Sequence, residues 1–165
     1  MKQELFFDML DTPIGPLTLV WTEKGLKAAS YKKAASGEVL EYSKGEKNNP
    51  YRAAFEAYFA GNDKAFKDMS LDMGGTSFQR RVWQLLLEIP AGETRCYGDL
   101  AKALGNPNAS RAVGWANGQN PVSIAVPCHR VIGKDGTLTG YAGGLKRKAW
   151  LLEHEGVSPL PLFGA

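Results

Sequence analysis

The chain has 165 residues, of which 44% are apolar and 22% charged, and this balance excludes a disordered tail and indicates a folded globular protein. Its N-terminus, MKQELFFDMLD, has too short an apolar run for a secretory signal, and we expect no segment that spans a membrane. The two cysteines predict a reducing, cytoplasmic setting without a disulfide framework.

The formal net charge of +3 is unevenly distributed along the chain. Residues 1–75 carry 10 Lys and Arg against 11 Asp and Glu, whereas residues 76–165 carry 10 against 6. A basic second half is consistent with a polyanionic partner such as a nucleic acid, but ordinary protein surfaces show an excess of this size too. Charge alone leaves both interpretations open.

The first part of the chain predicts a small antiparallel sheet followed by a helix. Alternating apolar residues mark three strands, at Glu4–Met9, Leu17–Trp21 and Leu26–Tyr31, separated by the turn sequences DTPIG and EKG. The stretch NPYRAAFEAYFAG predicts an amphipathic helix that begins after Asn49 and ends at Gly61. The aromatic residues have strand or helix spacing and are expected in the core.

Gly74 and Gly75 interrupt this pattern, and we expect an N-terminal domain over residues 1–73 and a C-terminal domain over residues 74–165. In the second domain, TSFQRRVWQLLLEIPAG predicts a helix with Phe78, Val82, Leu85 and Ile89 on one face. The stretches CYGDLAKALG and ASRAVGWANGQ, joined by NPN, predict two short helices with the spacing of a helix-turn-helix.

The second helix of this pair is unusually rich in small residues: Ala109, Ser110, Ala112, Gly114, Ala116 and Gly118. Because glycine destabilises a helix, two glycines need a reason. One reason is close packing against the protein's own core. The other is close approach to a bulky external surface such as a nucleic-acid groove, with Arg111 as the long basic side chain that reaches into it. The composition does not distinguish them.

The stretch VSIAVPCHRVIG, residues 122–133, contains the most reactive combination of side chains in the sequence. Cys128 could be a buried structural thiol, a metal ligand or a nucleophile. Two cysteines and two histidines without metal-ligand spacing exclude a metal site. We expect His129 and Arg130 to lower the pKa of the thiol. The apolar residues before Cys128 alternate as in a strand. If the segment is extended, Cys128 and His129 point to opposite sides, so that a proton would pass between them through a water molecule.

The stretch LKRKAWLLEHEG predicts a last helix, which ends before Gly156. Glu153 and Glu155 lie at its C-terminal end, where the helix dipole disfavours negative charge. A solvated surface acid explains either residue. The alternative is that one of them orients a histidine and stabilises its cation.

Four motifs in this order give the chain a recognisable pattern: RAVGWANGQNP at 111–121, PCHRVIG at 127–133, GYAGG at 140–144 and WLLEHEG at 150–156. With them the chain resembles the O6-alkylguanine-DNA alkyltransferases. The resemblance implies an α+β fold: a small N-terminal sheet-and-helix domain related to ribonuclease H, and a mostly helical C-terminal domain with a winged-helix-like DNA-binding unit.

The resemblance also implies the roles of the catalytic residues. Cys128 would accept the alkyl group, His129 would take the thiol proton through a water molecule, and Glu155 would orient His129. Tyr97 would protonate the guanine at N3 as it leaves. Arg111 would fill the gap that the flipped nucleotide leaves in the DNA stack.

For the DNA-binding surface and the base pocket, the resemblance implies two further sets of residues. Ala109, Ser110, Ala112 and Gly114 would accompany Arg111 in the minor groove. Asn120 would tie the recognition helix to the active-site segment, Tyr141 would flank the base, and the backbone amide of Ala142 would face O6. The backbone carbonyls of Cys128 and Val131 would accept hydrogen bonds from the exocyclic amine.

The implied activity is DNA repair by a single-turnover methyltransferase. An alkyl group would pass from O6 of guanine, and from O4 of thymine, to the protein's own cysteine after base flipping. No cofactor and no metal are implied, and the partner would be double-stranded DNA bound by a monomer. Three alternatives compete with this interpretation: a lesion-binding relative without the cysteine, a helix-turn-helix regulator with an incidental thiol, and a cysteine hydrolase.

Overall fold

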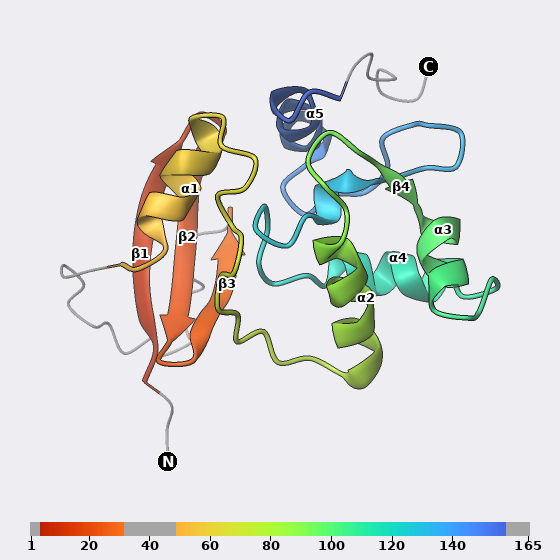
Figure 1. Cartoon of the computed structure of the whole chain (residues 1–165), viewed down its shortest axis with the longest axis horizontal. Coiled ribbons are helices and arrows are strands. Elements are labelled where there is room, and N and C mark those ends of the chain that lie inside the picture. Colours follow the sequence, from red (N-terminus) through yellow and green to blue (C-terminus); the bar gives the residue numbers. More distant parts are fainter. Residues whose placement is uncertain (1–3, 32–48, 158–165) are drawn as a thin grey trace. The chain divides into compact units, whose positions relative to one another are not determined.

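The computed structural model describes residues 4–31 and 49–157 of the chain (Figure 1). Parts of both expected domains, residues 1–3, 32–48 and 158–165, lie outside the described residues. The chain divides into two compact units, Met1–Gly74 and Gly75–Ala165. At this division Gly74 and Gly75 both have positive φ, 65° and 85°, and a Cβ on Gly75 would lie 2.6 Å from the ring of Trp83. Glycine is therefore required at position 75.

The first unit contains the predicted antiparallel sheet. Its strands are β1 (Phe6–Thr12), β2 (Gly15–Thr22) and β3 (Gly25–Ser30), in the order β1-β2-β3. The sheet confirms the three predicted strands, but β1 extends beyond the expected end at Met9. The reason is the tight turn after it, in which Thr12 Oγ1 donates to the carbonyl of Gly15 at 2.6 Å and accepts from the amide of Ile14 at 3.1 Å.

The predicted helix of the first unit is α1 (Arg52–Phe59), which lies against the sheet (Figure 1). Its buried side chains are Phe55 and Tyr58. Arg52 also joins the helix to β1, because its Nη2 lies 2.8 Å from Oδ2 of Asp8. This unit therefore has its own apolar core, as the spacing of its aromatic residues predicts.

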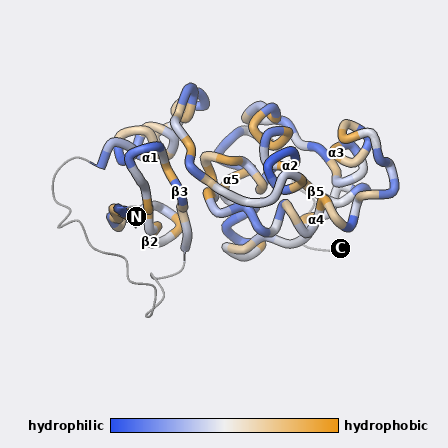
Figure 2. Tube along the Cα trace, turned by 90° about the horizontal axis from the view of Figure 1, so that it is seen from below, coloured by the Kyte–Doolittle hydropathy of each residue, from blue (hydrophilic) through white to orange (hydrophobic). Residues whose placement is uncertain are grey.

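The second unit is mostly helical. Its elements in chain order are α2 (Ser77–Leu87), β4 (Arg95–Cys96), α3 (Tyr97–Ala103), α4 (Ser110–Gly118), the 3-10 turn η1 (Cys128–Arg130), β5 (Val131–Ile132) and α5 (Leu145–His154). The short strands β4 and β5 pair in parallel, with Arg95 opposite Val131. The helices confirm the predicted pair α3 and α4 and the last helix α5, and Figure 2 shows that they carry both hydrophobic and hydrophilic residues.

The buried face of α2 differs from the predicted one. Val82 is buried as expected, but Phe78 and Leu85 are only half-buried, and the core side also contains Trp83 and Leu86. Ile89 is buried too, but it lies beyond the end of the helix at Leu87. The indole of Trp83 turns inward because its Nε1 donates to the carbonyl of Ala116 in α4 at 2.9 Å. This hydrogen bond fixes α2 against the helix that carries the expected DNA-binding residues.

The expectation of a strand before Cys128 is wrong: Val122 is only an isolated bridge residue, and residues 123–126 form turns and a bend. The backbone groups of this segment bond partly to one another, with the amide of Val126 donating to the carbonyl of Val122 at 3.1 Å, and partly to the side chain of Asn120. Asn120 Nδ2 donates to the carbonyls of Val126 at 2.8 Å and Val122 at 3.3 Å, and Oδ1 accepts from the amide of Val122 at 3.0 Å. Ile124 has a φ of 74°, a left-handed conformation that no regular strand contains.

Candidate active site

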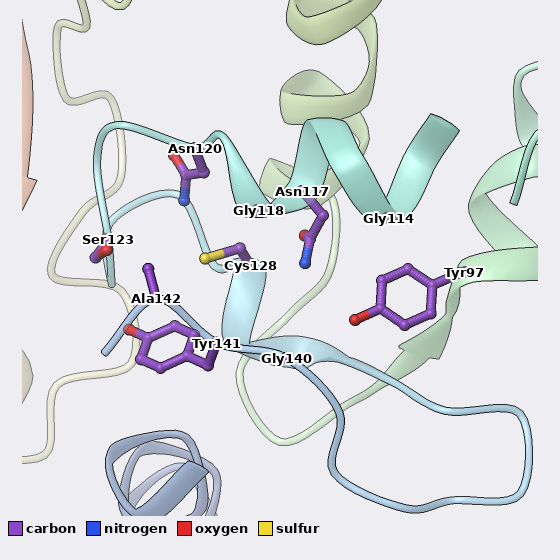
Figure 3. A pocket seen from close by; sticks show the side chains of 10 residues that line it. All are labelled: Tyr97, Gly114, Asn117, Gly118, Asn120, Ser123, Cys128, Gly140, Tyr141 and Ala142. Atoms are coloured by element: carbon purple, nitrogen blue, oxygen red, sulfur yellow. The ribbon is translucent and has the colours of Figure 1, made fainter. Parts of the chain in front are cut away.

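A cavity of about 290 Å³ in the second unit exposes the sulfur of Cys128 to a ligand (Figure 3). Figure 3 shows Tyr97 and Asn117 on one side of the cysteine, and Tyr141 and Ala142 on the other. Because α3, α4, η1 and the loop before α5 all contribute, the folded unit is needed to form the cavity. Its lining residues are Tyr97, Gly114, Asn117, Gly118, Asn120, Ser123, Cys128, Gly140, Tyr141 and Ala142.

Cys128 begins a 3-10 turn and not an extended strand, which corrects the expectation for this segment. The amide of Cys128 donates to the carbonyl of Val126 at 2.8 Å, and the amide of Arg130 donates to the carbonyl of Pro127 at 3.0 Å. Successive side chains of a 3-10 helix are about 120° apart, compared with about 180° in a strand. The turn directs Cys128 to the cavity while His129 lies fully buried behind it.

A buried network joins His129 to the end of α5. His129 Nε2 lies 2.6 Å from Oε2 of Glu155, and both side chains are almost inaccessible to solvent. Arg130 binds the same carboxylate with two nitrogens, Nε to Oε1 at 2.7 Å and Nη2 to Oε2 at 3.0 Å. Its remaining nitrogen, Nη1, donates to the carbonyl of Ile89 at 2.6 Å. Of the two acids at the end of the helix, Glu155 therefore contacts the histidine, and Glu153 is exposed.

The network fixes the charge states of its members. Although burial opposes ionisation, the hydrogen bond to His129 and the charge of Arg130 lower the pKa of Glu155 to about 2. Burial lowers the pKa of His129 despite the nearby carboxylate, which favours a neutral imidazole. If Nε2 carries the proton that Glu155 accepts, Nδ1 keeps a lone pair. This Nδ1 is buried and has no hydrogen-bond partner in the described part of the protein, so it is available as a base.

Burial raises the pKa of the Cys128 thiol, which is 6% exposed. The expectation that His129 and Arg130 lower this pKa is therefore wrong for the resting protein. Its physical reason is twofold: His129 is buried and neutral, and Arg130 is neutralised by Glu155. Asn120 and the charge of Lys148 favour the thiolate, but desolvation outweighs them. The thiol is thus protonated until a base removes the proton.

Lys148, which sequence reasoning missed, lies fully buried in α5. Its Nζ donates to the carbonyls of Val131 at 2.6 Å, Thr139 at 2.6 Å and Gly140 at 3.4 Å. Burial lowers its pKa to about 8. These hydrogen bonds tie the loop at Gly140, which lines the cavity, to the strand after Cys128. The signal was present in the sequence, because Lys148 occupies a position of the apolar stripe that continues with Leu151 and Leu152.

Two polar side chains face the cysteine from the helix pair. Tyr97, the first residue of α3, has its hydroxyl 3.2 Å from Oγ1 of Thr139. Asn117 is buried in α4, and its Oδ1 has no hydrogen-bond partner among the described residues. A buried amide oxygen without a partner is costly, so it indicates a site that a ligand's donor completes. Sequence reasoning missed Asn117, since asparagine in a helix has no distinctive pattern.

Three of the four expected pocket residues line the cavity, whereas the fourth, Val131, is fully buried in β5 and is not part of its wall. Asn120, Tyr141 and Ala142 line it, and the ring of Tyr141 packs edge-on to His129 with centroids 6.5 Å apart. The carbonyls of Cys128 and Val131 already accept hydrogen bonds, from the amide of Val131 and from Lys148 respectively. An incoming amine would therefore have to use the second lone pair of each oxygen.

The expected DNA-binding residues lie on α4 and at its start. Arg111 and Ala112 are exposed, whereas Ala109, Ser110 and Gly114 are half-buried. A Cβ on Gly118 would meet nothing within 4 Å, and one on Gly114 would lie 3.7 Å from the Tyr97 ring, an ordinary contact. The protein's own packing therefore does not require either glycine of α4. This favours the other reason for the glycines, close approach to an external surface.

Within residues 4–31 and 49–157, no three His, Cys, Asp or Glu side chains gather closely enough to hold a metal ion. In the same part of the chain, no helix has the length and apolar character needed to cross a membrane.

Comparisons with known proteins place the chain among proteins with the same two units. A family model described as "6-O-methylguanine DNA methyltransferase, ribonuclease-like domain" matches residues 5–73, and one described as "6-O-methylguanine DNA methyltransferase, DNA binding domain" matches residues 77–157. A methylated-DNA–protein-cysteine methyltransferase of Methanosarcina acetivorans is 50% identical over 155 residues, which cover 92% of this chain and 99% of that protein. The chain belongs to the 6-O-methylguanine DNA methyltransferase family.

Other members of the family are similar over nearly their whole length. A methylated-DNA–protein-cysteine methyltransferase of Salmonella typhimurium is 46% identical over 164 residues, covering 92% of this chain and 96% of that protein. The crystal structure of the Mycobacterium tuberculosis O6-methylguanine methyltransferase superposes with a TM-score of 0.79 at 44% identity, covering 96% and 97% of the two chains. The structure of the M. tuberculosis protein in complex with DNA gives 0.78 at 45% identity, covering 91% and 92%. These matches confirm the α+β fold class and the resemblance that the sequence motifs indicate.

Proposed function

We propose that the protein repairs alkylated DNA by transferring an alkyl group from O6 of guanine to Cys128, once per molecule. The observation that carries this proposal is the thiol at a ligand-sized cavity, backed by a buried His129–Glu155 pair. Family membership supports the same activity, since the relatives are methylated-DNA–protein-cysteine methyltransferases. O4-alkylthymine is proposed as a second substrate.

The reaction begins with activation of the thiol. His129 Nδ1 takes the proton of Cys128, directly or through one water molecule, and becomes the cationic imidazolium. Glu155, ionised and 2.6 Å from Nε2, stabilises that cation and holds the ring in the required tautomer. Burial of the thiol means that the thiolate forms only when this base accepts the proton, in a dry site where the nucleophile is strongly reactive.

In the transfer step the sulfur of Cys128 attacks the alkyl carbon. The S–C bond forms as the C–O6 bond breaks, and its electron pair goes to the guanine oxygen and ring. Tyr97 donates a proton to N3 of the base, so that guanine leaves as a neutral molecule. Protons then re-equilibrate between the imidazolium, the tyrosine and solvent. The product is a thioether, which no group of this site can cleave, and the protein is therefore consumed. No cofactor or metal takes part in this scheme.

The proposed substrate complex requires base flipping, because O6 of guanine lies inside the duplex. We place Ala109, Ser110, Ala112 and Gly114 against the minor groove, where the small residues of α4 allow close approach. Arg111, which is exposed, would enter the stack where the nucleotide was. Asn120 would couple this helix to the active site through its hydrogen bonds to the segment before Cys128.

The pocket for the flipped base would use the walls of the cavity. Tyr141 would pack beside the base and the amide of Ala142 would face O6. The carbonyls of Cys128 and Val131 would accept from the exocyclic amine with their second lone pairs. Because one unit supplies every group in this scheme, we propose that the protein acts as a monomer, and that it does so in the cytoplasm on double-stranded DNA.

Intact-mass measurement tests the proposal. After incubation with excess duplex containing O6-methylguanine, the chain should gain one methyl group, and peptide analysis should place it on Cys128. Repair should stop at one lesion per molecule. Turnover beyond one equivalent, or methyl on Cys96 with Cys128 unmodified, would contradict the mechanism.

A further inference from the structure

Trp115 is the most exposed large apolar side chain in the described part of the chain. It is 71% exposed, compared with 48% for Met9 and 41% for Leu87. Isolated apolar residues on a surface are common and need no explanation. The place of Trp115 is what distinguishes it, because it lies in α4, the helix that carries the proposed DNA contacts.

Trp115 lies one helical turn after Arg111, on the same side of α4. At 100° per residue, the two side chains are separated by about 40° around the helix axis. The adjoining side of α4 faces the cavity through Gly114, Asn117 and Gly118 (Figure 3). The indole is therefore next to both the proposed intercalating arginine and the wall of the cavity.

None of the residues next to Trp115 on the helix surface has a large apolar side chain. The residues three and four positions away are Arg111, Ala112, Gly118 and Gln119. Gly118 has open space where a side chain would be, and Ala112 is exposed. Because two of the four neighbours are small, a rigid indole can meet a flat or concave surface on that side without clashes, at a low cost in conformational entropy.

We propose that Trp115 is a second DNA contact of α4, with its indole packed against the sugar–phosphate wall of the groove beside the flipped nucleotide. This inference rests on the proposed function. A base that enters the cavity must pass α4, so its strand has to run close to the helix side that carries Arg111 and Trp115. The deoxyribose faces of that strand are apolar, and residues 76–165 are basic, with 10 Lys and Arg against 6 Asp and Glu. The contact is independent of base sequence.

Binding to an undamaged, fluorescein-labelled duplex separates this contact from the chemistry. Trp115→Ala should weaken binding by roughly 5- to 50-fold, the order of magnitude expected when the partial burial of one large apolar side chain is lost. Trp115→Phe should restore most of the loss. The matched control is Leu87→Ala, which removes an exposed apolar side chain from α2 and should leave binding unchanged. Equal affinities for Trp115→Ala and the unchanged protein would overturn the inference.

The salt dependence gives a readout that a loss of folding would not reproduce. Because the indole is uncharged, Trp115→Ala should shift the plot of log Kd against log salt concentration without changing its slope, whereas Arg111→Ala should make the slope smaller. A slope changed by Trp115→Ala would mean that the variant rearranges the charged contacts, and would also overturn the inference.

Two further measurements identify other occupants of this surface. Transfer from free O6-benzylguanine, which requires no DNA, should be as fast in Trp115→Ala as in the unchanged protein. A slower reaction would show that Trp115 supports the cavity instead. Sedimentation should show the same monomer for both proteins, and a dimer lost in Trp115→Ala would assign the indole to a second copy of the chain. If no variant and not even the unchanged protein transfers an alkyl group, the proposed function fails, while the difference in duplex affinity still decides the role of Trp115.

Discussion

Glu155→Gln removes the charge of the carboxylate that holds both His129 and Arg130, while it preserves the size of the side chain. In the proposed mechanism the histidine becomes a cation when it takes the thiol proton, and Glu155 lies 2.6 Å from its Nε2. Without the negative charge, that cation is formed in a buried site beside the charges of Arg130 and Lys148, which both disfavour it. General acid–base catalysis contributes roughly 100- to 10,000-fold to a rate, and we expect a loss within this range.

The same change should lower stability, by an amount that follows from the pKa. The pKa of Glu155 is about 2 in the folded protein against an ordinary value of 4.5, and this difference corresponds to about 3 kcal/mol. Because the folded pKa is the lower one, the stabilisation is fully present above pH 4.5 and is lost as the pH falls towards 2. At pH 7 the free energy of unfolding of Glu155→Gln should therefore be lower by about 3 kcal/mol, and its decrease between pH 4.5 and 2 should be smaller.

Single-turnover rates with a methylated duplex measure the loss of transfer rate, and urea unfolding monitored by circular dichroism measures the loss of stability. Glu153→Gln is the matched control, because Glu153 is exposed in the same helix and should change neither quantity. Unfolding data show whether the variant is folded under the conditions of the kinetic assay, so that slow transfer is not confused with loss of the fold. If Glu155→Gln is folded and transfers the alkyl group at the original rate, the charge of Glu155 does not stabilise the His129 cation, and its proposed role is refuted.

Three other variants test separate parts of the proposal. Cys128→Ala should bind methylated duplex with unchanged affinity and transfer nothing, and a gain of methyl mass would disprove the role of this cysteine. Arg111→Ala should slow repair in duplex DNA far more than reaction with free O6-benzylguanine, which needs no flipping; equal losses would assign Arg111 to the pocket. Lys148→Met should lower the free energy of unfolding by about 2–4 kcal/mol in urea titrations, because it leaves buried carbonyls without their charged donor. Lys146→Met, an exposed change in the same helix, should have no measurable effect, and an equal loss would show that the effect of Lys148→Met does not come from its buried hydrogen bonds.

The sequence by itself determined the order of the elements and the identity of the reactive group. The period of apolar residues located the three strands and the helices α1 and α2, since that period reflects which face each element buries. The turn NPN between two short stretches located the pair α3 and α4, and Gly156 marked the end of α5. The motif around Cys128 and His129 and the acid at the end of the last helix indicated the chemistry through their resemblance to a known family. These features are local, so a linear pattern contains them.

Only the tertiary structure decided the conformation around the thiol and the charges that control it. Residues 123–126 are not a strand, because turn hydrogen bonds and the side chain of Asn120 bond their backbone groups, and alternation of apolar residues cannot reveal this pairing. Arg130 lies two residues after Cys128 in the sequence, but its guanidinium pairs with Glu155 at the end of α5 instead of activating the thiol. Lys148 is buried although lysine is normally a surface residue. Each outcome depends on burial and on partners far apart in the chain, and desolvation, which raises the pKa of Cys128, exists only once the chain has folded around it.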